Sequence, residues 1–347
     1  MLLRLWRRMG VATARDAATA AERVARRLER HDKRVDRLRE ILERQEKHGA
    51  AIAESLGDVR ASIARIEQAV AEVGEQARML TLARKHDATA LDAARQLAAE
   101  LEATAGAIDA HVAGTIEHAT VSSDPFPHVA IDRLLPPSLY DRVLEVLPPH
   151  AYWRSSGEAR DYWEIGADVG PWQTEVIWGF IDRRLVNEML RPRLLDLFRS
   201  HLGSFWRDHF GLDPTCVSYY AAEGRLQRRR KGYRLRPHLD PPHAALTGLL
   251  YLARPGDDPM HGTSLYRPAT PLPVKRQGIF YPEDHGITLE SAVTVPFQAN
   301  RLLVWMTPLG PHGADLTAHD VPKSIERYTY QFQFVIDKDT RRRLRAK

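Results

Sequence analysis

The stretch Asn300-Arg-Leu-Leu-Val-Trp-Met306, which continues as Thr-Pro-Leu-Gly-Pro-His312-Gly313, is the most informative part of this 347-residue sequence. Its first half is a short apolar run of the kind that forms a buried strand, and the Pro and Gly residues that follow end the strand. Similar short runs lie on either side: Val217–Ala221, Leu246–Leu252, Ser264–Tyr266, Val293–Val295 and Tyr328–Ile336. Many short strands separated by Pro and Gly turns predict a β-sandwich or jelly roll flanked by helices.

The sequence changes character at about residue 120. No Pro precedes Pro125, and all nine Phe, all 11 Tyr and six of the seven Trp follow residue 120. The first third is rich in Ala, Arg and Glu. Its apolar residues recur at alternating steps of three and four: Val24, Leu28, Val35, Leu38, Leu42, Ile52, Leu56, Val59, Ile63, Ile66, Val70, Val73 and Leu80, then more weakly Leu91, Leu97, Leu101, Ile108 and Val112. This repeat predicts a long α-helical coiled coil. We therefore expect an α+β protein with an oligomerisation or spacer region over 1–120 and a second domain over 121–347.

Composition excludes several classes of protein. Cys216 is the only cysteine, which excludes an internal disulfide and a cysteine-based metal site and favours a cytoplasmic setting. No apolar run reaches the length of a membrane-spanning helix. Residues 1–9 are apolar and basic, which fits peripheral contact with an anionic membrane or a frayed helix start. The net charge of +5 is too small to indicate nucleic acid as a partner.

Two separated motifs predict a metal site. In His238-Leu239-Asp240 the two outer side chains point to the same side of an extended chain, so an imidazole and a carboxylate can share one ion. His312 follows the apolar strand and supplies a second imidazole, although His319 is a rival for that role. Two histidines and one carboxylate suit non-haem Fe(II), because they leave three coordination positions open. Arg327, at the head of a strand, is suited to bidentate binding of a carboxylate.

Residues 124–338 resemble the Fe(II)/2-oxoglutarate-dependent oxygenases of the prolyl-hydroxylase-like type. The resemblance rests on these motifs together with Asp124-Pro-Phe-Pro-His-Val-Ala-Ile-Asp-Arg-Leu-Leu-Pro-Pro137 and Gly262-Thr-Ser-Leu-Tyr266. It implies a double-stranded β-helix fold that binds Fe(II) through the two histidines and the aspartate. It further implies 2-oxoglutarate and O2 as cosubstrates, with Arg327 on the far carboxylate, and ascorbate as an accessory reductant. Tyr219, Tyr233 and Tyr251 are candidates for a further hydrogen bond to 2-oxoglutarate.

The function expected from this resemblance is hydroxylation of a sugar polymer, a small molecule or a protein side chain by a homo-oligomer. The alternative is a non-catalytic scaffold or binding protein that keeps the oxygenase fold. The segment Arg225–Arg236 holds seven basic residues in twelve. It is either a solvated loop beside the pocket or a segment that attracts an anionic substrate.

Overall fold

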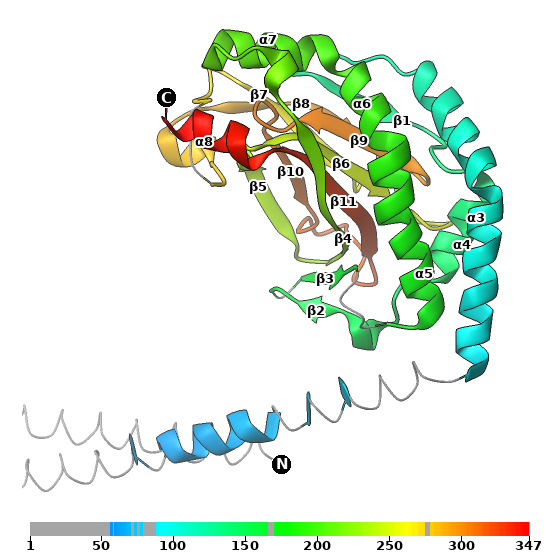
Figure 1. Cartoon of the computed structure of the whole chain (residues 1–347). Coiled ribbons are helices and arrows are strands. Elements are labelled where there is room, and N and C mark those ends of the chain that lie inside the picture. Colours follow the sequence, from blue (N-terminus) through cyan, green and yellow to red (C-terminus); the bar gives the residue numbers. More distant parts are fainter. Residues whose placement is uncertain are drawn as a thin grey trace, which may run out of the picture. The chain divides into compact units, whose positions relative to one another are not determined.

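The computed structural model describes residues 56–57, 59–70, 73–74, 77–78, 88–157, 159–165, 170–274 and 278–346 (Figure 1). The chain divides into two compact units, Met1–Thr81 and Leu82–Lys347. Among the described residues, no helix has both the length and the apolar character needed to cross a bilayer. The predicted membrane contact through residues 1–9 lies outside the described residues.

Within the first unit, residues 59–70 are helical. Several apolar residues of the predicted heptad stripe are exposed in this helix, with Ile63 at 41%, Ile66 at 40% and Val70 at 66%. An exposed apolar stripe is what one chain of a coiled coil presents to its partner helix. The stripe before residue 56 lies outside the described residues, so the coiled coil and the oligomer stay predictions.

The helix α3 (Ala88–Glu117) differs from its predicted role, because it is part of the second unit. Its buried side chains join the main core of that unit: Leu97, Leu101, Ala105, Ile108, Val112 and Ile116. In Figure 1 α3 lies along α5 (Trp172–Phe180). The weaker stripe that we assigned to the coiled coil is thus the buried face of a domain helix. The structural division falls at residues 81/82 rather than at 120/121.

Two antiparallel sheets form the centre of the second unit. The large sheet has the order β1-β9-β6-β11-β4-β3-β2 and the small sheet the order β5-β10-β7-β8. The strands of the large sheet are β1 (His128–Ile131), β9 (Arg301–Met306), β6 (Ala244–Tyr251), β11 (Glu326–Ile336), β4 (Tyr219–Arg230), β3 (Arg160–Glu164) and β2 (Arg154–Ser155). Those of the small sheet are β5 (Arg234–His238), β10 (His312–Asp315), β7 (Thr263–Pro268) and β8 (Leu289–Val295). This sheet-rich α+β core agrees with the predicted jelly roll, and each predicted apolar run overlaps a strand.

Helices cover one face of the large sheet. The remaining helices and single turns are α4 (Pro137–Glu145), η1 (His150–Tyr152), η2 (Ile181–Leu190), α6 (Arg191–Leu197), α7 (Arg199–Phe210), η3 (Pro214–Cys216), η4 (Pro282–His285) and α8 (Lys338–Ala346). Alternate residues of the strands, such as Leu226 and Tyr330, pack with these helices in the main core. We call this the helix-side face. The opposite face, which we call the cavity face, meets the small sheet, where Leu249, Leu265 and Trp305 form a second apolar cluster.

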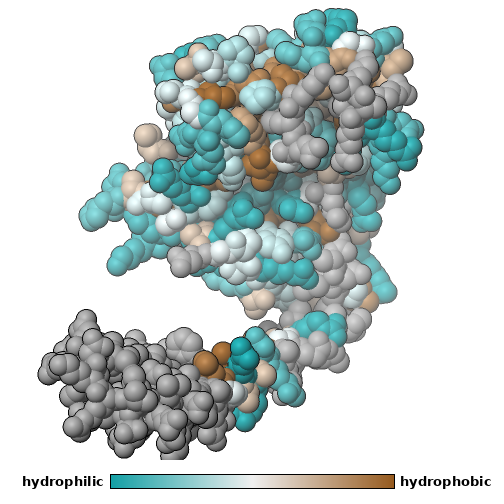
Figure 2. All heavy atoms as spheres, turned by 90° about the vertical axis from the view of Figure 1, so that its left-hand side faces the viewer, coloured by the Kyte–Doolittle hydropathy of each residue, from teal (hydrophilic) through white to brown (hydrophobic). Residues whose placement is uncertain are grey.

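The basic segment Arg225–Arg236 is strand rather than solvated loop. Residues 225–230 complete β4, which pairs with β11 on one side and β3 on the other, and Arg234–Arg236 begin β5. Local composition hides these strands because charged residues on both faces of a strand give no apolar alternation. Hydrophilic residues, drawn in teal, are widespread on the coloured part of the surface in Figure 2.

Candidate active site

A cluster of two histidines and one aspartate lies where β5 and β10 meet. His238 at the end of β5 and His312 at the start of β10 are direct register partners, which brings their side chains to adjacent positions. Their ring centroids are 4.4 Å apart, and His238 Nε2 lies 3.4 Å from Asp240 Oδ1. One potential ligand atom from each of the three residues lies within 4.8 Å of the others, and all three residues are buried. Among the described residues this is the one such group.

Hydrogen bonds to the far side of each ring fix how the imidazoles point. His238 Nδ1 lies 3.0 Å from the carbonyl oxygen of Arg236, and His312 Nδ1 lies 3.0 Å from that of Gly310. A carbonyl oxygen only accepts, so each Nδ1 carries the proton and each Nε2 keeps its lone pair for a metal ion. Gln333 Nε2 donates to Asp240 Oδ2 over 3.2 Å, and this hydrogen bond fixes the orientation of the carboxylate.

The surroundings of His312 keep its ring neutral and in place. Burial, with the neighbouring His238, lowers the pKa of His312 to about 4. The Trp305 ring packs on it at a centroid distance of 4.5 Å. Gly313 is needed next to it, because a Cβ there would lie 2.7 Å from the carbonyl oxygen of Leu235 on β5. A neutral, fixed imidazole is the form that binds a metal.

Arg327 is buried on the cavity face, and the side chains that it contacts by a hydrogen bond or over a ring are neutral. It is 4% exposed, donates to Thr263 Oγ1 over 2.9 Å, and lies over the rings of Tyr251 and Phe297 at 5.3 and 5.2 Å. No described residue places a carboxylate within ion-pair distance of it. Burial lowers the pKa of Arg327, although a guanidinium keeps its charge at neutral pH.

Three buried polar atoms beside this guanidinium have no hydrogen-bond partner among the described residues. They are Arg327 Nε, Tyr251 Oη and Thr329 Oγ1. Tyr251 and Thr329 are register partners on β6 and β11, so these groups converge. Burial raises the pKa of Tyr251, so its hydroxyl stays a donor. Because unsatisfied buried polar groups are costly, a cluster of them around a buried cation fits an anionic ligand such as a carboxylate.

The metal cluster and the Arg327 side chain both line one cavity of about 630 Å³ on the cavity face. Its lining includes the three residues of the metal cluster and Arg327, Thr263 and Thr329. Four arginines line it against two carboxylates, Asp240 and Glu164. The cavity can therefore hold a metal ion, a small dianion and a further ligand in one compartment.

The sequence candidates fall into three groups. His238, Asp240, His312, Arg327 and Tyr251 come together as expected, whereas His319 is exposed and outside the cluster. Tyr233 lines the cavity, and the Arg229 guanidinium carbon lies 4.7 Å from its ring centroid. Tyr219 accepts a hydrogen bond from Trp206 on the helix-side face and takes no part in the site.

Thr263, Thr329 and Gln333 were not among the sequence candidates, and Arg229 was included only as part of the basic segment Arg225–Arg236. Thr329 and Gln333 lie two and six residues after Arg327 on one strand, and alternation along that strand would have found Thr329. A bulge between Gln331 and Gln333 obscures the alternation further on. Thr263 on β7 and Arg229 on β4 are far from Arg327 in the sequence, so no local sequence pattern predicts that they lie next to it.

No family model matches the sequence, and no curated protein matches it. Solved structures that match parts of this chain include a prolyl hydroxylase from Trichoplax adhaerens, bound to a hypoxia inducible factor peptide. It has 14% identity and a TM-score of 0.35, covering 72% of this chain and 96% of that chain. A Pseudomonas putida prolyl-4-hydroxylase has 16% identity and a TM-score of 0.33, covering 66% and 98%.

HygX from Streptomyces hygroscopicus, solved with nickel, 2-oxoglutarate and hygromycin B bound, has 13% identity and a TM-score of 0.35, covering 60% and 82%. At such identities and TM-scores the similarity carries no inference about substrate or reaction. The assignment of the site therefore depends on its own geometry.

Proposed function

We propose that this protein is an Fe(II)- and 2-oxoglutarate-dependent dioxygenase that hydroxylates a substrate C–H bond. The observation that supports the proposal is the pairing, in one buried cavity, of a His-Asp-His cluster with a buried arginine that no described carboxylate neutralises. The first suits an octahedral metal with three open positions. The second suits the far carboxylate of a dicarboxylate cosubstrate.

The donor atoms fit the metal that this function requires. His238 Nε2, His312 Nε2 and an Asp240 oxygen would hold it, because the Nδ1 atoms are already bound to carbonyl groups. When bound, the iron would supply the activation of O2. In the overall reaction 2-oxoglutarate, O2 and R–H give succinate, CO2 and R–OH.

The protein's own residues position the reactants. Arg327 and Thr263 would bind the far carboxylate of 2-oxoglutarate, with the Tyr251 hydroxyl donating to it. Leu249 and Trp305 line the cavity and exclude water near the metal cluster. Gln333 keeps Asp240 in its ligating orientation without binding the metal itself.

The test is succinate formation from 2-oxoglutarate by purified protein with Fe(II) and ascorbate, with iron binding measured on the same samples. We expect slow turnover without substrate in the wild type, loss of iron binding in His238→Ala, and loss of turnover with retained iron in Arg327→Gln. His319→Ala is the matched control because it removes the rival, exposed histidine, and we expect it to behave as the wild type.

Each contrary result points to a different error. If His319→Ala loses iron and His312→Ala does not, the metal cluster is wrongly assigned. If the wild type binds neither iron nor 2-oxoglutarate, the protein is a scaffold with an oxygenase-like fold.

A further inference from the structure

The strands β3, β4 and β11 present three rows of side chains to the cavity. Strand pairing sets Arg327 opposite Arg229, and Arg229 opposite Arg160. The register gives two further rows. They are Thr329, Gln227 and Tyr162, then Gln331, Arg225 and Glu164. All nine residues line the cavity. One end of this surface is therefore a row of three arginines drawn from three strands.

Arg229, in the middle of that row, is a buried cation with neutral partners. It is 5% exposed, and its guanidinium donates to Gln227 Oε1 over 2.6 Å and to the carbonyl oxygen of Asp161 over 3.3 Å. Its guanidinium carbon lies 4.7 Å from the Tyr233 ring centroid. Among the described residues none offers it a carboxylate at ion-pair distance. Burial, Arg160 and Arg327 all act to lower the pKa of Arg229.

A row of like charges is unfavourable unless something neutralises it. Cross-strand neighbours have Cβ atoms about 5 Å apart, and like charges placed there repel. Arg228, one residue away but on the helix-side face, has two carboxylates, Asp161 and Glu326. The sequence therefore neutralises arginines on one face and leaves those in the cavity for a ligand. In the proposed function Arg327 binds one anionic group, the far carboxylate of 2-oxoglutarate. Arg229 and Arg160 can bind a second anionic group.

We propose that Arg229, with Arg160 opposite it on β3, binds an anionic group of the primary substrate. This group is a carboxylate, sulfate or phosphate, so the substrate is an acidic small molecule or an acidic sugar unit. The inference rests on the proposed function, in which Arg327 holds 2-oxoglutarate. A planar guanidinium stacked on an aromatic ring suits such a group because it presents two parallel N–H donors. Gln227 and Tyr162, in the next row, lie where the rest of the substrate would extend towards the metal.

The test measures the melting temperature of the full chain with Mn(II) in place of iron. Sodium sulfate, phosphate and acetate are titrated at constant ionic strength, with and without saturating 2-oxoglutarate. Sulfate and phosphate probe a tetrahedral anion and acetate probes a carboxylate. We expect at least one of them to raise the melting temperature saturably, and to do so equally well when 2-oxoglutarate is bound.

The variants locate the effect. Arg229→Gln should weaken the apparent affinity about tenfold, as expected for one lost hydrogen bond to a charged group. Arg160→Gln, an exposed position, should weaken it by about twofold to fivefold and serves as a second variant with little risk to folding. Arg236→Gln is the matched control: it removes one charge from the same segment, but its side chain is exposed and paired with Asp284.

Three results would overturn the subsite. These are no stabilisation of the wild type by any of the three anions, equal stabilisation of Arg229→Gln, and an anion effect that 2-oxoglutarate abolishes. The last would place Arg229 in the cosubstrate site. Failure of 2-oxoglutarate itself to stabilise the wild type, with the anion effect intact, would instead overturn the proposed function and leave Arg229 as an anion site.

Discussion

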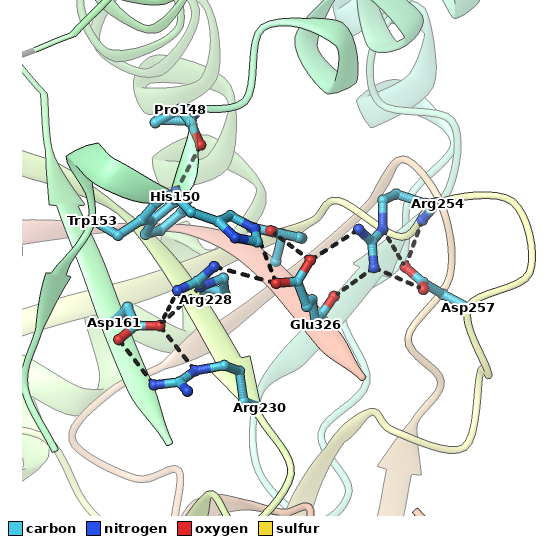
Figure 3. Close-up of polar contacts among 10 residues, drawn as sticks. Pro148, His150, Trp153, Asp161, Arg228, Arg230, Arg254, Asp257 and Glu326 are labelled. Carbon is cyan, nitrogen blue, oxygen red and sulfur yellow. Dashed lines mark hydrogen bonds and ion pairs between the residues drawn. The ribbon is translucent and has the colours of Figure 1, made fainter. Parts of the chain in front are cut away.

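The two faces of one piece of sheet, where β3, β4 and β11 pair, treat positive charge in opposite ways. On the helix-side face, Asp161 pairs with Arg228 and Arg230, and Glu326 pairs with Arg228 and Arg254 (Figure 3). The close-up also shows His150 pointing at Glu326, at 3.1 Å. Each of these arginines therefore has a carboxylate from a neighbouring element.

On the cavity face the same strands carry Arg229 and Arg327, which the described part of the chain leaves without a carboxylate. Arg228 and Arg229, two adjacent arginines of β4, thus have different environments: Arg228 is paired with carboxylates and Arg229 faces the cavity. Charges satisfied within the chain hold the sheet together, because removing one partner of a buried pair is costly. Charges left unsatisfied in a cavity are kept for what binds there.

The largest effect on folding stability is expected from the helix-side face. Asp161 is 3% exposed, and Asp161→Asn would leave Arg228 and Arg230 without its charge. We expect the free energy of unfolding to fall by about 3–5 kcal/mol in urea titrations. Asp92→Asn breaks an exposed pair with Arg95 and should cost less than about 1 kcal/mol. Similar losses in the two variants would show that the helix-side cluster is not structural.

The next effect concerns the cavity face and pH. The pKa of His312 is lowered to about 4, below the unfolded value, so the unfolded chain takes up this proton first as pH falls. Metal-free protein should therefore lose stability between about pH 6.5 and pH 4, by an amount on the order of 3 kcal/mol. His312→Gln should lack this part of the pH dependence. Parallel pH profiles for the two proteins would contradict the buried, neutral state of His312.

A smaller effect should follow from Gln333, which acts on the metal through Asp240. Gln333→Ala removes the hydrogen bond to Asp240 Oδ2 and should weaken Mn(II) or Fe(II) binding by about tenfold to a hundredfold. Gln331→Ala is the matched control, because Gln331 lines the same cavity but accepts from Gln227. Equal metal affinity in the two variants would remove Gln333 from the site.

The smallest effect on folding stability is expected from Arg229, which can be compared directly with its neighbour Arg228. Arg228 and Arg229 are sequence neighbours and both are buried. Without ligand, Arg229→Gln should change the free energy of unfolding by less than about 1 kcal/mol, since it removes a desolvated charge that no carboxylate neutralises. Arg228→Gln should cost about 3 kcal/mol. If the two losses are equal, the faces do not differ in the way that we infer.

Much of the fold could be predicted from local pattern. The apolar runs at 246–252, 301–306 and 328–336 became β6, β9 and β11, because a continuous or alternating apolar run has one favourable conformation in a buried sheet. The buried side of α3 was also visible as a stripe. Its partner was not, since a stripe of Leu and Ile packs equally well on a second chain or on α5 of its own domain.

The sequence by itself determined the types of residue at the site: His238 and Asp240 at a two-residue spacing, a histidine after a buried strand, and an arginine at a strand head. Only the tertiary structure decided that His312 rather than His319 completes the cluster, through its register with His238. It also decided that Arg228 meets Asp161 whereas Arg229 faces the cavity. The physical reason is that spacing along a strand fixes which side chains share a face. What each face meets is set by register with strands about 70 to 100 residues away.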